Sequence, residues 1–405
     1  MCKFEENFRK FIDEKSVEIS TILEFVDLIG KYTNWIKKKK NYCNCTFVEN
    51  KNNCAKKKVQ LFYRGESKDF GDSKLTAGAF RSLSSHHYDY NNKLKDYRRE
   101  IVHTLSDREI RFIKSVSQHH GLETSLVDIS SNAFIALFFA LKNSKDSTKD
   151  SYVYTFEDYI DISDLFYKHG DEISVLDELR TMENKQFIKD LFKTFNKSIY
   201  FCYIKEKSRN LLEILYKSCP HFDDIENKFN HIILDTLGIF LTTIGTPDEK
   251  KQIVEIWKEH NQIIPDEKRD PDANKIIYSH TKLYMLLLTL YLQKYYKDPN
   301  KFLNKKCDII PNLFLNPAIP FERINLQQGA FFAQQYISNS VDDKIYLMQH
   351  IKHSRVIIIN GDSNRDSNGD PKRDIIKDLD NILNINIGTI FGDRDSIASY
   401  INNKK

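Results

Sequence analysis

The chain has 405 residues, of which 40% are hydrophobic and 12% aromatic, enough to build a sizeable core in one large domain or two ordinary ones. Its 61 basic and 57 acidic residues leave a net charge of +4, which excludes the bulk positive surplus typical of nucleic-acid-binding proteins. The chain opens with acidic residues where a secretory signal needs an apolar segment, and its longest apolar run, Leu283–Leu292, is far shorter than the roughly 20 residues of a membrane span. With seven unevenly spread cysteines, these features predict a cytoplasmic protein that does not associate with membranes.

The N-terminal part is predicted to be helical and to precede the main domain. Residues 4–38 carry apolar side chains near a period of about 3.6, which is typical of an amphipathic helix. A polar stretch over 39–58 is expected to be an exposed excursion, so residues 1–58 form an N-terminal segment. The alternating pattern of 59–63 then predicts a strand, and Arg64-Gly65-Glu66 is expected to end it.

The next part predicts a compact core of strands around one buried helix. Residues 92–118 are predicted to form an amphipathic helix, and the partly β-branched stretch Thr124–Asp128 to form a strand. Ser130, Ser131 and Asn132 offer N-cap chemistry for an apolar helix over 133–142, and Tyr152–Phe156 follows as another strand.

The second half begins with a long helical lobe and returns to strands. Residues 158–300 are mostly helical in pattern, and strand-like patterning resumes at 321–332. Arg355–Asn360 predicts a buried strand, a helix follows at about 371–384, and 397–401 closes the chain. The fold class is therefore α/β (mixed α+β): one domain with a mixed β core and a large helical insertion over 158–300.

The most informative stretch is Gln118–Ala140, where polar residues directly precede an apolar helix. Its first half carries two histidines, a glycine, Thr124 and Asp128, whereas 133–141 has no charge. The apolar half must be buried and so fixes the polar residues to the core, which is how a rigid scaffold usually presents a functional site.

Three candidate site residues can each be interpreted in a functional or a structural way. Arg64 beside Gly65 could place a guanidinium on a phosphate where a ligand approaches the backbone, or could be a surface arginine in a tight turn. His119 could be a general acid or base, or simply a satisfied core histidine. Asp128, expected to be half-buried, could hold Arg64 or cap the turn at 130–132.

No metal is expected. The spacing of Cys43 and Cys45, with Cys54, does not match the usual zinc knuckle. The loop 362–369 resembles a calcium loop, but Ile375 stands where a bidentate glutamate is needed. Lysine runs at 37–40 and 56–58 are either a solvated face or a contact with nucleic acid.

Four separated motifs together resemble the FRG-domain family, named for a Phe/Tyr-Arg-Gly motif. They are Phe62-Tyr63-Arg64-Gly65, then Gln118–Ala140, then Arg323, Ile324, Gln327, Gly329 and Phe331, and finally Phe391-Gly392-Asp393 with Ile397. The resemblance spans 59–403 and places the helical lobe inside one domain. Glu123 stands where the family pattern has proline, Ser125 where it has arginine, and Ile129 where it has tryptophan.

The resemblance implies a function as well as a domain. FRG-domain proteins recur in bacterial genomes in settings suggestive of phage defence, and the order of motifs is similar to an ADP-ribosyltransferase core. It implies a toxic effector that binds NAD or a related nucleotide and transfers or cleaves ADP-ribose, with a protein or nucleic acid as a possible acceptor. The implied catalytic residues are Arg64, His119, Asp128 and Gln327, and the implied cofactor-binding residues are Tyr63, Arg64, Gly65, Thr124, Ser130 and Asn132.

Two questions stay open at this stage. A glutamine at 327 cannot supply the negative charge that a developing cation needs, so either Glu66 or Asp128 supplies it, or the site binds a nucleotide without turning it over. The alternatives to the enzyme are a nucleic-acid-binding or nuclease toxin and a non-catalytic nucleotide sensor or interaction module.

Overall fold

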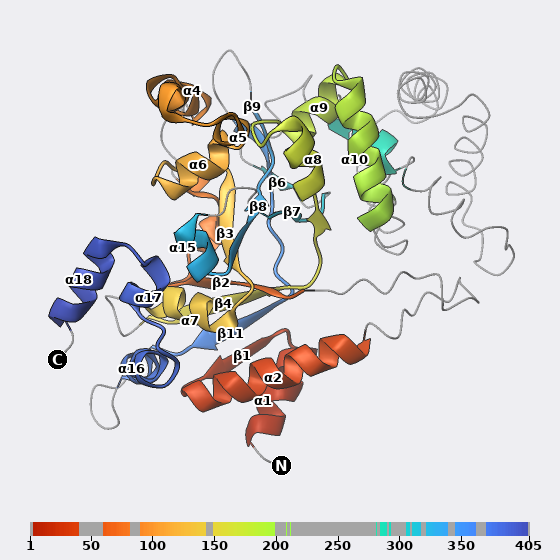
Figure 1. Cartoon of the computed structure of the whole chain (residues 1–405). Coiled ribbons are helices and arrows are strands. Elements are labelled where there is room, and N and C mark those ends of the chain that lie inside the picture. The colour runs from red at the N-terminus through yellow and green to blue at the C-terminus, as the bar shows by residue number, and fades with distance from the viewer. Residues whose placement is uncertain are drawn as a thin grey trace, which may run out of the picture.

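The fold is a large mixed sheet with helices packed on it (Figure 1). The computed structural model describes residues 3–39, 60–81, 90–142, 149–198, 305–307, 310–316, 321–338, 345–361 and 370–403, with isolated positions between 208 and 292. The main sheet has eight strands in the order β1-β11-β4-β2-β3-β8-β7-β5, and a smaller sheet has the order β6-β10-β9.

The strands of the main sheet come from distant parts of the chain. They are β1 (Ser16–Ile19), β2 (Phe62–Glu66), β3 (Leu126–Ser130), β4 (Ser151–Phe156), β5 (Ile160–Asp161), β7 (Leu313–Leu315), β8 (Gly329–Ala333) and β11 (Arg355–Ile359). The smaller sheet consists of β6 (Lys305–Cys307), β9 (Tyr336–Ser338) and β10 (Ile345–Gln349). Parallel and antiparallel pairs both occur in the main sheet, since β1 runs parallel to β11 and β4 antiparallel to it. The predicted mixed α/β class is therefore confirmed.

Helices connect these strands along the chain. They are α1 (Lys3–Asp13), α2 (Ile22–Lys39), α3 (Gly78–Arg81), α4 (Tyr90–Ile101), α5 (Asp107–Arg111), α6 (Ile113–His119), α7 (Ala133–Lys142), α8 (Ser163–His169), α9 (Val175–Thr181), α10 (Lys185–Ser198), α15 (Glu322–Leu326), α16 (Pro371–Leu383), α17 (Ile387–Phe391) and α18 (Arg394–Asn403), with short 3-10 turns at Gly71–Ser73 and Val102–Thr104. None of the helices in the described ranges combines the length and the apolar character needed to cross a bilayer.

Alternating side chains of β2 divide the core between the two faces of the sheet. Tyr63 packs in one cluster with residues of α1, α2, α7 and α16, whereas Phe62 packs in another with Val127, Ile129 and Phe332. A third cluster joins α8, α9 and α10 to β5, β7 and β8. Because successive strand residues point to opposite faces, Arg64 and Glu66 lie on the side of Phe62.

The apolar helix predicted over 133–142 is confirmed as α7, and it lies directly against β2. Asn132 caps it, because its Oδ1 accepts a hydrogen bond from Phe134 N at 2.9 Å. Gly65 is where the helix and the strand come closest. A Cβ there would lie 1.9 Å from Ala136 O and 2.5 Å from Ala140 N, so this strand position requires glycine.

The single helix predicted over 4–38 is wrong, because a strand divides it. Lys15 has a φ of 62° and ends α1, after which Val17 and Ile19 alternate into the core. Strand β1 pairs with β11, so this part of the chain completes the edge of the main sheet. Tertiary pairing here overrides a helical pattern that continues on both sides of the strand.

A buried cation anchors these N-terminal elements to the sheet. Arg355 Nε donates to Phe11 O at 2.9 Å, and its Nη1 donates to the Tyr32 hydroxyl at 2.9 Å and pairs with Glu157. Phe11, Tyr32 and Trp35 all place rings within 6 Å of the guanidinium carbon. The Arg355 and Glu157 side chains are only 8% and 10% exposed.

Other boundaries also differ from those predicted. Strand β2 includes Arg64, Gly65 and Glu66, which were expected to end it. The helix predicted over 92–118 is divided into α4, α5 and α6, and Ser106 forms a capping box that starts α5. The strand-like stretch 321–332 begins as the short helix α15 and continues as β8.

The strands predicted at 152–156 and 355–360 and the helix at 371–384 are confirmed as β4, β11 and α16. In the predicted lobe, α8, α9 and α10 are helical as expected. Of the excursion predicted over 39–58, Lys39 is the last residue of α2, and the rest, with the three cysteines, lies outside the described residues, as does the loop at 362–369.

Acid should destabilise the fold through His353. Its ring packs edge-on against Tyr154 at 5.0 Å, and burial, followed by the charges of Lys74, His350 and Lys15, lowers its pKa to about 4. The unfolded chain takes up this proton near pH 6.5, so stability falls as the pH drops from about 6.5 to about 4. In urea unfolding at pH 7 and pH 5, His353→Phe is expected to reduce the acid-induced loss by about 1 kcal/mol. An unchanged loss would contradict the assignment to His353.

Candidate functional site

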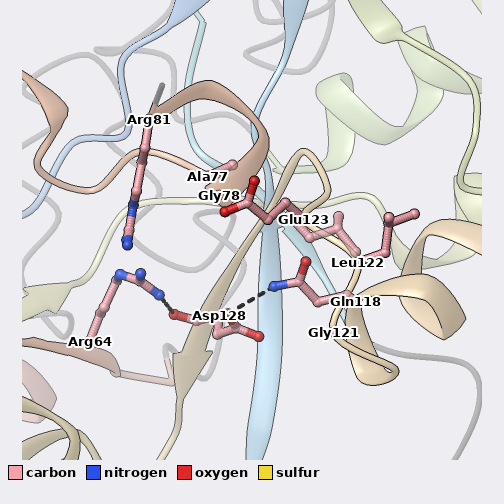
Figure 2. Close-up of a pocket in the computed structure, with 10 residues that line it drawn as sticks. Arg64, Ala77, Gly78, Arg81, Gln118, Gly121, Leu122, Glu123 and Asp128 are labelled. Atoms are coloured by element: carbon pink, nitrogen blue, oxygen red, sulfur yellow. Dashed lines mark hydrogen bonds between the residues drawn. The ribbon is translucent and has the colours of Figure 1, made fainter. Parts of the chain in front are cut away.

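A cavity of about 170 Å³ opens beside β2 and β3 (Figure 2). Its walls come from β2, α3, the end of α6, and the loop that leads into β3. The lining residues are Arg64, Ala77, Gly78, Arg81, Gln118, Gly121, Leu122, Glu123, Leu126 and Asp128.

The cavity lies where two neighbouring strands separate. Strands β2 and β3 pair only at Tyr63 and Ser130, although each continues for several residues. Beyond this pair, Nη1 of Arg64 donates to the backbone carbonyl of Asp128 at 2.6 Å. A side chain thus takes the place of the ladder hydrogen bonds and holds the two strands together at the cavity.

Glu66 is a buried counterion of the two arginines of the cavity. Its Oε1 accepts from Arg64 Nε at 3.3 Å and from Leu75 N at 3.2 Å, and lies 3.7 Å from Arg81 Nη2. The Glu66 side chain is 2% exposed, and its Oε2 has no partner among the described residues. One carboxylate therefore serves two arginines.

The loop that carries Arg81 is fixed by buried polar groups. Gln334 Oε1 accepts from Ala77 N at 2.7 Å, and Ala79 N donates to Thr124 O at 3.2 Å. Arg81 Nε donates to Thr76 O at 3.0 Å. Burial, and next the charge of Arg64, lower the pKa of Arg81, which nevertheless remains a cation at neutral pH. Its guanidinium faces Arg64 across the cavity (Figure 2).

Gln118 orients the carboxylate of Asp128 on the opposite wall. Gln118 Nε2 donates to Asp128 Oδ2 at 3.0 Å, and Gln118 Oε1 accepts from Thr124 Oγ1 at 2.7 Å. Thr124 Oγ1 in turn accepts from Leu126 N at 3.1 Å. Asp128 is exposed, which corrects the prediction that it is half-buried.

The cavity has two electrostatic sides. Arg64 and Arg81 approach it from β2 and α3, whereas Glu123 and Asp128 present carboxylates from the loop and β3. Glu66 neutralises part of the arginine charge. The arrangement suits a ligand that carries a positive and a negative group close together.

Residues 59–149 match the model of the FRG domain. The match covers β2, α6, β3 and α7, and so includes Arg64, Gln118 and Asp128. No curated protein and no solved structure matches the chain.

Within and beside this FRG match, the structure separates the predicted catalytic residues. Arg64 and Asp128 line the cavity together, but His119 and Gln327 do not. His119 stacks on Phe321 at 4.1 Å, and burial, followed by the charges of His120 and Arg323, lowers its pKa. Gln327 Nε2 is 3.5 Å from Ile390 O.

Most of the predicted cofactor-binding residues have contacts that organise the sheet and α7. Tyr63 is buried on the α7 side, where burial raises its pKa to about 12, and Gly65 is covered by α7. Ser130 Oγ donates to Gln327 O at 2.7 Å, and Asn132 caps α7. Thr124 reaches the cavity only through Gln118.

Four residues in or beside the cavity have no site role that the motifs assign. Gln118 and Glu123 lie inside the second motif, and the sequence offers Glu66 only as a source of negative charge. Arg81 has no sequence signal, because a short loop and the folding of α3 bring it to Arg64.

Only part of the residues considered for metal binding or for the basic patch lies in the described ranges. In the ranges the structure describes, no group of three or more His, Cys, Asp or Glu side chains could hold a metal ion. Lys37 and Lys38 are exposed at the end of α2 and do not line the cavity.

Proposed function

We propose that the cavity binds the nicotinamide end of NAD and that the chain cleaves the bond between nicotinamide and ribose. The observation that carries this proposal is the pairing of two arginines with two carboxylates around one small cavity. Oxidised NAD joins a cationic ring to an anionic pyrophosphate, and so has both charges that the two sides of the cavity would complement.

The volume of the cavity supports a ligand that enters with one end. A cavity of about 150 Å³ can hold a single benzene ring, whereas drug-sized ligands occupy pockets of about 300–1,000 Å³. At about 170 Å³ the cavity has room for one ring. The remainder of the dinucleotide would extend outside it.

Arg81 is the residue best placed to meet the phosphates. Its only carboxylate contact among the described residues is the 3.7 Å approach to Glu66, and its side chain is 35% exposed. A guanidinium can bind phosphate through two parallel hydrogen bonds. Arg64 is more fully engaged, by Asp128 O and Glu66, and would shape the wall rather than follow the ligand.

Asp128 would stabilise the reacting ribose. When the bond from the ribose C1′ to the ring nitrogen breaks, its electron pair goes to the nitrogen and leaves nicotinamide neutral. Positive charge then develops on C1′ and the ring oxygen of ribose, where a fixed carboxylate lowers the barrier. Water attacks C1′ and loses a proton, which gives ADP-ribose; an acceptor hydroxyl or amine would give the transfer product instead.

The structure favours Asp128 over Glu66 for this role. Glu66 pairs with the arginines through a 2% exposed side chain and would act as a positioning residue. Asp128 is exposed to the cavity and held by Gln118 at 3.0 Å. A carboxylate that must face a ligand but keep its orientation needs this combination.

The resemblance to FRG-domain proteins extends the proposal to a biological role. A cytoplasmic bacterial effector that consumed NAD would be toxic to a phage-infected cell, and a protein or nucleic acid could serve as acceptor. A nuclease toxin and a non-catalytic sensor are the alternatives that the experiment must separate.

The test is nicotinamide release, with NAD binding measured by titration calorimetry. The wild type is expected to bind NAD and release nicotinamide, and Asp128→Asn to bind it with similar affinity but release nicotinamide roughly 100-fold more slowly. Asp164→Asn, an exposed change on α8, is the matched control and should behave as wild type.

Three results would count against the proposal. Binding without release would show a sensor, and absence of both would exclude an NAD site. A normal rate in Asp128→Asn would remove that residue from the reaction.

A further inference from the structure

Glu123 places an additional carboxylate in the cavity. It lies on the loop between α6 and β3, where the FRG pattern that the sequence resembles has proline. Its Cβ and Cγ are 3.3 Å from the position a Gly78 side chain would occupy, so its stem packs against α3. Figure 2 shows its carboxylate beside Gly78 on the upper wall of the cavity.

This carboxylate differs from its neighbours in having no hydrogen-bond or ion-pair partner among the residues that the structure describes. Glu66 accepts hydrogen bonds from Arg64 and Leu75, and Asp128 accepts one from Gln118. Glu123 forms no hydrogen bond or ion pair within the part of the chain that the structure describes, although its charge acts on Arg81. Its charge is therefore available to a group inside the cavity.

We infer that Glu123 is a specificity residue that makes the cavity prefer a positively charged ring to a neutral ring of the same size. The inference rests on the proposed function and names the form of the dinucleotide that the site selects. NAD⁺ and NADH have nearly the same shape but differ by one charge on the nicotinamide ring. A site with an unpartnered carboxylate should therefore bind NAD⁺ more tightly than NADH.

Glu123 would act without joining the reaction. Asp128 is oriented for the ribose by its bond to Gln118, whereas Glu123 comes from a different wall and is held through its stem by Gly78. Neutralising it should change the choice between the two dinucleotides and leave the orientation of Asp128 intact. The exposure of Glu123 limits the effect to about 5- to 10-fold, because solvent screens the interaction.

The experiment compares dissociation constants for NAD⁺ and NADH by titration calorimetry. The wild type should favour NAD⁺ by about 10-fold, and Glu123→Gln should reduce the ratio to about 2-fold, mainly by weakening NAD⁺. The matched control is Glu183→Gln, an exposed glutamate before α10 that does not line the cavity, and it should keep the wild-type ratio. Equal melting temperatures of the three proteins would show that folding is unaffected.

The outcomes distinguish the specificity role of Glu123 from the proposed NAD site on which it rests. If the wild type binds both dinucleotides equally, or if Glu123→Gln keeps the wild-type ratio, the specificity role is wrong while an NAD site remains. If the wild type binds neither dinucleotide, the proposed function itself fails. A reduced ratio confined to Glu123→Gln would support the specificity role and an NAD site, while nicotinamide release tests cleavage.

Discussion

Replacing Gly65 by alanine is expected to destabilise the protein by at least about 3 kcal/mol. The added Cβ would lie 1.9 Å from Ala136 O and 2.5 Å from Ala140 N, which are backbone atoms of α7. Neither can turn away as a side chain can, so the helix or the strand must move. Helix α7 contributes buried residues all along its length, and its displacement would disturb the core around β2.

Chemical unfolding in urea measures this effect, and Gly30→Ala is the matched control. Gly30 lies within α2, and a Cβ there would have no atom within 4 Å. Alanine in a helix interior should stabilise the protein by about 0.5–1 kcal/mol, so the same substitution is expected to have opposite signs at the two glycines. A Gly65→Ala protein as stable as wild type would show that the close contact with α7 is absent.

The close contact also explains why the Phe-Tyr-Arg-Gly motif has glycine at position 65. The sequence placed Gly65 beside Arg64 and suggested that glycine admits a ligand to the backbone. The structure shows that α7 occupies this space, while Arg64 points to the other face. One dipeptide thus serves two faces of the sheet, with glycine packing the helix and arginine building the cavity.

The elements that the sequence predicts well are those with unmixed local signals. The apolar stretch 133–142, with Asn132 before it, is typical of a buried helix, and 356–359 is a continuous apolar run typical of a buried strand. Strand β1 was missed because its four residues lie between two helices, and its pairing partner β11 is far away in the sequence. Local patterns do not contain such pairing.

The site could be predicted only in part, because its residues also meet through contacts between distant parts of the chain. Arg64 and Asp128 stand in motifs and do meet, but through the backbone carbonyl of Asp128, which no residue pattern reveals. His119 was selected for its chemistry, yet its ring stacks on Phe321, whose position depends on a distant part of the chain. Arg81 and Glu123 enter the cavity because α3 and the loop before β3 converge, which is a tertiary property.

Replacing Arg355 by methionine is expected to destabilise the protein by about 3–5 kcal/mol. The substitution removes the cation that pairs with Glu157 and the donor to Phe11 O and to the Tyr32 hydroxyl, and leaves Glu157 with only the hydrogen bond from Tyr32. An unpaired carboxylate in this 10% exposed position would have lost its water without gaining a cation. Urea unfolding should show the loss, and limited proteolysis should release the segment containing α1 and α2 first.

A double variant separates the contribution of the Arg355–Glu157 ion pair from that of the packing of Arg355 against the aromatic rings. Arg355→Met combined with Glu157→Gln removes both charges, so it should recover a large part of the stability lost in Arg355→Met alone. Arg99→Met is the control. The Arg99 side chain is 72% exposed and pairs with Asp96 at the surface, so its loss should change stability by less than about 0.5 kcal/mol. If the double variant were as unstable as Arg355→Met, the stacking of the guanidinium on Tyr32 and Trp35 would outweigh its charge. In either case the N-terminal helices depend on a residue of β11, a strand two places from β2 in the main sheet.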